Sequence, residues 1–346
     1  MISIPNADNY QSWLVDATEY PSVAGLRSRL IFFLRYALLA VSANNAQPWL
    51  FVVEEECIIV KYSKRKLLPV MDPFGRSLYI GIGAAIANIV VAANHFGYSV
   101  DIEYVFDDTI IAKLRVCESQ KKDSLQEEMF SSITLMKTNR NKRLDLPIPR
   151  DVIKAVESIV AVHDMRHQLV EDERGKECLG SYVATSVMNV FSNPRSRKDL
   201  AGWVRTNYTR LFDGMPAFTK GIPDLPSIFV PTLLKYVDIG KLHARSARKM
   251  VTSAPTIIVL GSKGDTFREW VAIGQCLQQT ALMATSRELA VGIFIGPVEF
   301  ADLRNHVICN LGLHFSPQIF LSIGYCEKEV RHSPRHQLRH VLKDSN

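Results

Sequence analysis

The sequence predicts an α+β protein made of two related halves. Its 346 residues alternate helix-like and strand-like segments, and a long apolar helix followed by strands occurs twice. The two long helices align at an offset of 191 residues, which pairs Gly274 with Gly83. Matches at small and apolar positions are weak evidence singly, but their shared order favours a duplicated α+β unit. The other matched pairs are Ile273 with Ile82, Ala284 with Ala93, and Val291 with Val100.

Hydrophobic periodicity and chain breakers define the elements of the first half. Residues 26–41 have the pattern of an amphipathic helix. The long helix predicted at 82–96 ends before Gly97, which suits a left-handed C-terminal cap. Pro147 and the residues after it open a later helix at 150–160. The remaining predicted elements are strands at 50–53, 58–61, 100–105 and 110–116, and a charged helix at 122–136.

The second half follows the same outline. A strand at 257–260 precedes its long helix, and strands at 291–295 and 319–323 follow it. We therefore divide the chain into a first half at 20–130 and a second half at 131–340.

One segment of the second half has no counterpart in the first. Residues 180–250 contain helix-like stretches broken by Gly and Pro, which indicates an inserted helical segment. Such an insertion fits the cover of a binding site, which Trp203 and Phe212 would help to close. It fits an ordinary long excursion as well.

Composition and charge argue against several classes of protein. The net charge of +6 is modest for this length, and no helix-turn-helix, zinc-finger or RNP-like pattern accompanies it, so no nucleic-acid partner is expected. The six cysteines are far apart and include no Cys-x-x-Cys pair, which is typical of reduced thiols in a cytoplasmic protein. His163 and His167 have the i, i+4 spacing of a metal pair, but no third ligand is evident. We interpret them as surface histidines and expect no metal site.

No membrane association is expected either. The chain starts without a basic cluster or an apolar core, so no signal peptide is predicted. Residues 77–95 are long enough to span a bilayer and carry no Asp, Glu, Lys or Arg. They include Asn88 and Asn94 and are rich in Gly and Ala, which favours a buried helix instead.

The most informative stretch is the loop from Ser42 to Trp49. Asn45 and Gln47 carry carboxamides that donate and accept hydrogen bonds, which suits the edge of a flavin or a pyrimidine. Pro48 holds Gln47 extended, and Trp49 adds an apolar anchor. The alternative is an ordinary helix-to-strand turn whose amides bond their own backbone.

Several motifs, taken in order, resemble the FMN-dependent nitroreductase superfamily. The pattern Ser-x-x-Asn-x-Gln-Pro-Trp at 42–49 is similar to its first signature, and residues 72–80 with the helix that follows are similar to a block of its long branch. In that branch one chain carries both halves of the usual dimer. Thr138-Asn139-Arg140 and Ser333-Pro334-Arg335 are weaker matches. The resemblance implies a nitroreductase-like fold with a pseudo-dimer inside one chain, although further oligomerisation stays open.

The resemblance also implies a set of cofactor-binding residues. Ser42, Asn45 and Gln47 would lie against the flavin ring, and Thr138, Arg140 and Arg335 would bind its phosphate. Backbone N–H groups near Glu288 and Leu289 would face the hydride-accepting nitrogen, although the family commonly has a glycine where Glu288 stands. The first basic position of the family's phosphate loop falls on Met136, a departure that Lys137 would have to compensate. Arg76 is interpreted as an anchor of its helix, and Arg331 as a weaker phosphate candidate than Arg335.

The implied function is that of an FMN-dependent oxidoreductase. It would take hydride from NADH or NADPH and reduce an electron-poor small molecule such as a nitro compound, a quinone or an enone. No side chain need act as a nucleophile, so no catalytic residue is assigned. The alternatives are an FMN storage protein with little reductase turnover and an interaction protein that has lost the cofactor. Because the two halves differ in their motifs, at most one FMN per chain is expected.

Overall fold

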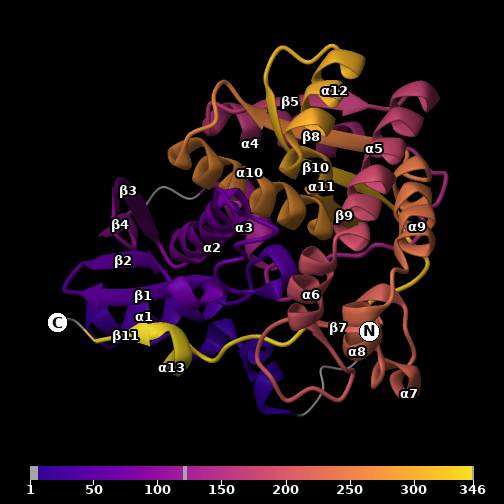
Figure 1. Ribbon diagram of the computed structural model, residues 1–346. Helices are drawn as coiled ribbons and strands as arrows, with labels where there is room; N and C mark the ends of the chain where they lie inside the picture. Colours follow the sequence, from indigo (N-terminus) through magenta and orange to yellow (C-terminus); the bar gives the residue numbers. More distant parts are fainter. Residues whose placement is uncertain (1–6, 120–122, 345–346) are drawn as a thin grey trace.

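Two helices of 20 residues lie side by side at the centre of the molecule. They are α2 (Arg76–His95) and α10 (Phe267–Ser286), and each has a β-sheet on its outer side (Figure 1). The computed structural model describes residues 7–119 and 123–344. Its mixture of helices and mainly antiparallel sheets confirms the predicted α+β class.

The sheet beside α2 has five strands in the order β11-β1-β2-β4-β3. The strands predicted in the first half are all present and extend by at most two residues at either end. The structure gives β1 as Trp49–Glu54, β2 as Cys57–Tyr62, β3 as Tyr98–Asp107 and β4 as Ile110–Glu118. The accompanying helices are α1 (Leu26–Ala37), α3 (Ser124–Phe130) and α4 (Arg150–Val162).

Helix α2 begins six residues earlier than predicted, and the local contacts explain why. Gly75 adopts a φ of 76° just before the first turn, a conformation that glycine accepts without strain. The Asp72 carboxylate accepts a hydrogen bond of 2.9 Å from the backbone N–H of Leu78. This bond satisfies one of the free donors at the helix start. At the other end Gly97 has a φ of 84°, as the predicted left-handed cap requires.

The sheet beside α10 has four antiparallel strands in the order β5-β8-β10-β9. Its strands are β5 (Arg166–Val170), β8 (Thr256–Ser262), β9 (Ala290–Phe294) and β10 (Ser316–Gly324). Two helices, α11 (Gly296–Glu299) and α12 (Ala301–Leu311), lie between β9 and β10. Because His167 lies on β5 while His163 ends α4, the two histidines do not share a helix face as the spacing predicted. Instead, the His163 ring is 2.8 Å from the amide oxygen of Gln279.

The segment at 180–250 folds into helices around a small core of its own. Its apolar residues include Phe191, Val204, Met215 and Leu234. In Figure 1 it lies beside the ends of the central helices. Its elements are the second part of α5 (Glu173–Ser192), α6 (Pro194–Trp203), β6 (Val204–Arg205), β7 (Met215–Pro216), α7 (Asp224–Ser227), α8 (Val230–Tyr236) and α9 (Gly240–Thr252).

The C-terminal tail packs on the first sheet, and the first described residues pack against this tail. The C-terminal tail runs through α13 (Leu338–Val341) into β11 (Leu342–Lys343), which pairs in parallel with β1. The Trp13 indole N–H, near the start of the chain, donates a hydrogen bond of 2.8 Å to the carbonyl of Ser333 in this tail. The last residues therefore return across the molecule to the half in which the chain began.

Helices α2 and α10 approach each other most closely at two glycines. A Cβ added to Gly83 would lie 2.0 Å from the carbonyl oxygen of Val271, and one added to Gly274 would lie 2.0 Å from that of Ile80. At the offset of 191 residues, Gly83 corresponds to Gly274 and Ile80 corresponds to Val271. The two close contacts are therefore equivalent, as a two-fold axis through the crossing requires. Descent of the two halves from one duplicated unit stays a prediction.

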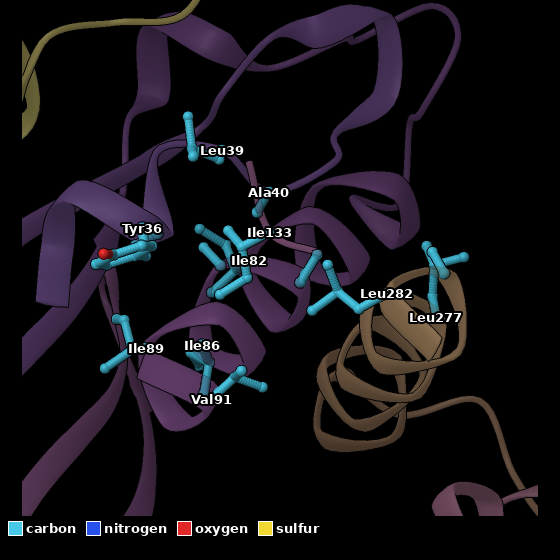
Figure 2. Packing of buried hydrophobic residues seen from close by; sticks show 14 of the residues in the cluster. Tyr36, Leu39, Ala40, Ile82, Ile86, Ile89, Val91, Ile133, Leu277 and Leu282 are labelled. Atoms are coloured by element: carbon cyan, nitrogen blue, oxygen red, sulfur yellow. The ribbon is translucent and has the colours of Figure 1, made fainter. Parts of the chain in front are cut away.

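The apolar core surrounds this crossing. Figure 2 shows Ile82 and Ile86 of α2 near Leu277 and Leu282 of α10, and all four side chains are at most 1% exposed. Helix α2 has the length and composition of a membrane span, but 83% of that window is buried in the structure. The prediction of a buried helix is confirmed. All six cysteines are free thiols.

We expect Gly83→Ala to lower the free energy of unfolding by about 2 kcal/mol or more, because the new methyl group cannot fit against the backbone of α10. Gly202→Ala, in α6, is the matched control, since an added Cβ there meets nothing within 4 Å. That control should leave stability equal or slightly raised. Urea unfolding of both variants measures the difference, and equal stabilities would contradict the role given to the glycine crossing.

Candidate functional site

Two adjoining cavities lie where the segment at 180–250 meets the central helices. We call this segment the covering segment. The larger has a volume of about 360 Å³ and the smaller about 90 Å³. The larger falls within the roughly 300–1,000 Å³ that small-molecule sites occupy. Both are lined by Val41, Ser42, Asn44, Thr138, Arg140 and Met215.

The smaller cavity is lined by cations and by no carboxylate among the described residues. Lys137, Arg140, Arg331 and Arg335 all lie on its wall. Arg331 is paired with Asp224 at 3.0 Å, whereas the other three have no ion pair within residues 7–119 and 123–344. A concave surface with uncompensated positive charge suits the binding of an anion, and we call it the anion site below.

Arg140 lines both cavities, and Lys220 adds a second cation on the wall of the larger one. Neither has a hydrogen bond or an ion pair within the part of the chain that the structure describes, and both line the larger cavity. The Lys220 side chain is exposed on the wall of the larger cavity, with many protein atoms around it. Burial, and then the charge of Arg140, lower the pKa of Lys220 to about 7. Burial also lowers the pKa of Arg140, although its guanidinium stays charged.

The loop that carries Thr138 and Arg140 is rigidly held. Thr138 bridges to Val291 of β9, and the Asn139 N–H donates a 2.8 Å hydrogen bond to the carbonyl of that residue. The Arg143 guanidinium, only 2% exposed, donates to the carbonyls of Asn139 and Asn141 at 2.7 Å each. Arg143 therefore shapes the loop from behind and leaves Arg140 to face the cavity.

Arg335 lies on the wall of the smaller cavity, and its partners are neutral. Its guanidinium donates to the amide oxygen of Asn45 at 2.6 Å and to the carbonyl of Pro334 at 3.1 Å. It lies 4.7 Å from the centre of the Trp13 ring. Burial lowers its pKa to about 9. An anion in the smaller cavity would supply the counter-charge that Arg335 lacks.

Asn45 and Gln47 face the C-terminal tail and the loop near residue 212. The Asn45 amide donates to the carbonyls of Gly214 at 3.0 Å and Pro334 at 2.9 Å. The Gln47 amide donates to the carbonyl of Phe212 at 2.7 Å, and its oxygen accepts from the N–H of His336 at 2.8 Å. The protein already uses most of the hydrogen-bonding groups of these two amides, although Asn45 also lines the smaller cavity. Their contacts indicate that they fix the tail; a direct contact of either with a flavin stays a prediction.

The polar side chains that this loop presents to both cavities are those of Ser42 and Asn44. The Ser42 hydroxyl oxygen accepts a 3.0 Å hydrogen bond from the N–H of Gln47, which leaves its own proton free to donate. Asn44 has a φ of 51°, and its amide makes only a 3.9 Å contact with the Met71 sulfur. Sequence reasoning singled out Asn45, which lines the smaller cavity, and missed Asn44, which lines both cavities, because the motif does not show in which direction each side chain turns.

Glu288 and Leu289 line neither cavity, so their expected place beside the reactive end of a ring is corrected. Their N–H groups donate to the carbonyls of Thr285 and Ala284 at the end of α10. Glu288 does adopt the left-handed conformation expected of a glycine, with a φ of 60°. Strand β9 then carries the chain onward, and its far end brings Ile295 and the following residue to the larger cavity.

The walls of the larger cavity are mainly apolar. The central helices and the sheet beside α10 contribute Ile80, Leu277, Ile293 and Ile319. The covering segment contributes Val187, Val190, Phe191, Leu200 and Met215 from its side, together with Ser186, Ser196 and Lys220. It therefore does cover the site, but the expected Trp203 and Phe212 line neither cavity. Trp203 instead lies under Lys66 and Arg205, at 5.6 and 6.0 Å.

Arg76 anchors its helix, as interpreted from the sequence. It is 5% exposed and lines neither cavity. Its guanidinium donates to the carbonyl of Val298 at 2.7 Å and to the carboxylate of Asp265 at 3.0 Å. The neighbouring polar residues Asp72, Ser77 and Glu299 do line the larger cavity. Within the described residues no group of three His, Cys, Asp or Glu side chains could hold a metal ion.

Comparison with known proteins gives structural neighbours but no relative in sequence. No family model matches the chain, and no curated protein sequence matches it significantly. Its structural neighbours include FMN flavoproteins of the nitroreductase family. The FMN-dependent nitroreductase NfnB from Mycobacterium smegmatis, solved with NADPH, has a TM-score of 0.42 and 16% identity over 64% of this chain and 100% of that chain.

Two further neighbours are similar over the same extent. The FMN and NADPH-dependent nitroreductase NfnB from sphigopyxis sp. strain HMH has a TM-score of 0.41 and 16% identity, over 63% of this chain and 99% of that one. Iodotyrosine deiodinase bound to FMN and 3-iodo-L-tyrosine has a TM-score of 0.40 and 12% identity, over 60% and 95%. More than a third of the present chain lies outside each match.

We expect Asn45→Ala to lower the free energy of unfolding by about 1–3 kcal/mol more than Asn44→Ala, because it removes the buried hydrogen bonds that Asn45 makes with Arg335 and with the carbonyls of Gly214 and Pro334. Both residues have positive φ, 54° and 51°, so the backbone cost of alanine is shared and cancels in the comparison. Denaturant unfolding of the two variants tests this. Equal losses would show that the Asn45 hydrogen bonds do not hold the tail.

Proposed function

We propose that the chain is an FMN-binding oxidoreductase that takes hydride from NADH or NADPH and passes it to an electron-poor small molecule. The observation that carries the proposal is the pair of unpartnered cations, Arg140 and Lys220, beside an apolar cavity. A phosphate attached to a flat apolar ring system meets both requirements at once. The motifs at 42–49 and 138–140, which resemble the nitroreductase superfamily, line or support these cavities.

The residues present fit FMN at its phosphate end and along its ring. Thr138, Arg140, Lys220 and Arg335 would hold the phosphate through a hydroxyl and three cations, and Ser42 and Asn44 would serve as polar partners nearby. Since these groups come from both halves and from the covering segment, the chain would build within itself an interface that a dimer builds from two copies. One such set of residues supports one FMN per chain.

FMN, when bound, supplies the hydride chemistry, and the protein supplies position and electrostatics. The cations neutralise the phosphate, and the apolar walls exclude water from the ring. Lys220 takes up a proton when the dianion arrives, because a nearby negative charge raises a pKa that burial and Arg140 had lowered. The covering segment decides which molecules reach the larger cavity.

The covering segment also supports a second candidate function, the storage of FMN. Five apolar side chains of this segment lie over the larger cavity, and they include Phe191 and Met215. A closed cover would exclude a nicotinamide. Anaerobic addition of NADH or NADPH to the FMN-loaded protein separates the two functions. Rapid bleaching of the flavin absorbance is the expected result, whereas a flavin that only dithionite reduces would favour storage and overturn the oxidoreductase.

We expect Lys220→Met to weaken FMN binding about tenfold or more while leaving riboflavin binding nearly unchanged, because riboflavin has no phosphate. In the parent, FMN affinity should fall as pH rises above about 7, where Lys220 of the apoprotein loses its proton. The variant should lack this dependence. Titration of the apoprotein, followed by flavin fluorescence, measures the FMN affinity, the riboflavin affinity and the pH dependence of the FMN affinity.

Lys235→Met is the matched control for this titration. Lys235 belongs to the same covering segment but lines neither cavity, so its loss should change neither affinity. Equal weakening of FMN and riboflavin by Lys220→Met would mean that Lys220 acts through stability and does not contact the phosphate.

A further inference from the structure

A cluster of charged side chains lies beside the larger cavity, and all of its members except the exposed Asp265 are buried or half-buried. It consists of three carboxyl groups, Asp72, Asp265 and Glu299, and two guanidinium groups, Arg76 and Arg304. Asp72 and Glu299 line the larger cavity and do not line the smaller one. With three acids and two bases, the cluster is neutral only when one carboxyl group keeps its proton. Because an uncompensated buried charge is costly, one proton is expected to stay.

Asp265 is not the group that keeps the proton. It receives hydrogen bonds from Arg76 at 3.0 Å and Arg304 at 2.6 Å, and the Trp270 indole N–H also donates to it. Burial acts to raise the pKa of Asp265, but these donors outweigh it and hold the pKa well below its usual range.

Burial raises the pKa of Asp72, but backbone N–H groups at the start of α2 and the charge of Arg76 oppose that shift and favour the carboxylate. Its Oδ2 caps α2 by accepting the 2.9 Å hydrogen bond from the N–H of Leu78, a contact that favours the charged form. It is 7% exposed, and its Oδ1 has no hydrogen-bond partner in the described residues. The carboxylate therefore places an unsatisfied negative charge next to the cavity.

Glu299 is left as the group that holds the proton. Its only hydrogen-bond donor among the described residues is the Ser77 hydroxyl, 3.0 Å from Oε1. Its Oε2 is 4.0 Å from the nearest Arg76 nitrogen and makes no hydrogen bond within residues 7–119 and 123–344. Burial, and then Asp72, raise the pKa of Glu299 to about 7, against the opposing effects of Arg76, Ser77 and Arg304.

No other charged group faces Glu299 from the elements packed on α11. Asp72 and Arg76 come from the start of α2, and Arg304 comes from α12. Strand β10 contains no charged residue, and α5 contains none after Glu177.

We propose that Glu299, in its protonated form, is a specificity-determining residue that donates a hydrogen bond to an oxygen atom of the electron acceptor. The inference rests on the proposed function and narrows its substrate to neutral molecules with a carbonyl or nitro oxygen. Acceptors that carry a carboxylate or a sulfonate are disfavoured, because Asp72 repels them.

The test measures binding to the oxidised, FMN-loaded protein, in which no turnover occurs. The probes are duroquinone and durene, which share a methylated ring and differ in the two carbonyl oxygens. Equilibrium dialysis at about pH 6 and about pH 8.5 should show that duroquinone binding weakens roughly five- to tenfold at the higher pH, the worth of one hydrogen bond. Durene binding should not change.

Three variants identify the group responsible. Glu299→Gln keeps the size and a donor but cannot titrate, so its duroquinone affinity should be the same at both pH values. Ser77→Ala removes a donor that favours the charged form of Glu299, so it should move the midpoint to higher pH. Glu171→Gln, an exposed glutamate that lines neither cavity, is the control and should behave as the parent.

The results separate the role of Glu299 from the proposed function itself. A yellow protein that binds duroquinone equally at both pH values overturns the role of Glu299 and leaves the proposed function standing. Persistence of the pH dependence in Glu299→Gln has the same meaning. A colourless protein that takes up no FMN overturns both. If Glu299→Gln does not fold, the contrast between duroquinone and durene in the parent still decides the matter.

Discussion

The close approach of α2 and α10 at Gly83 and Gly274 is the constraint on which the rest of the structure depends. Without side chains at these positions each helix rests on the backbone of the other, and the core residues around the crossing pack at short range. The start of α2 carries Asp72 and Ser77 to the larger cavity, and the middle of α10 carries Leu277 to it. A wider crossing would separate these walls and open the cavity to water.

A second constraint acts on the rim of the site. Asn45 and Gln47 hold the C-terminal tail against the loop near residue 212, and the tail in turn brings Arg335 to the smaller cavity. Residues almost 300 positions apart are thereby joined by buried hydrogen bonds, whose loss would leave several polar groups unpaired. The amides of Asn45 and Gln47 hold the tail in place, and the smaller cavity keeps Arg335 on its wall only while the tail is held there.

The two charged regions of the site, the cations Arg140 and Lys220 and the cluster around Glu299, differ in their balance of charge. At the anion site, Arg140 and Lys220 repel each other and lack a counter-charge, so folding costs free energy at any pH where Lys220 is charged. A bound anion removes that cost, which is why such a site binds phosphate tightly. At the cluster around Glu299 the charges are nearly balanced, and one retained proton completes the balance. The first region favours a charged group and the second a neutral one.

The sequence by itself determined the α+β class, the order of the main elements and the positions of the central glycines. These depend on local periodicity and on residues such as Gly97 and Pro147, whose backbone preferences act over a few neighbours. It also indicated Ser42, Thr138 and Arg140, which do line the cavities. Tertiary structure alone decided that Asn44 lines both cavities while Asn45 also holds the tail, that the end of β9 brings Ile295 to the larger cavity, and that Lys220 joins Arg140 there from the covering segment. Such pairings arise between segments distant in the chain, where direction and burial set the chemistry of a side chain and no local pattern records them.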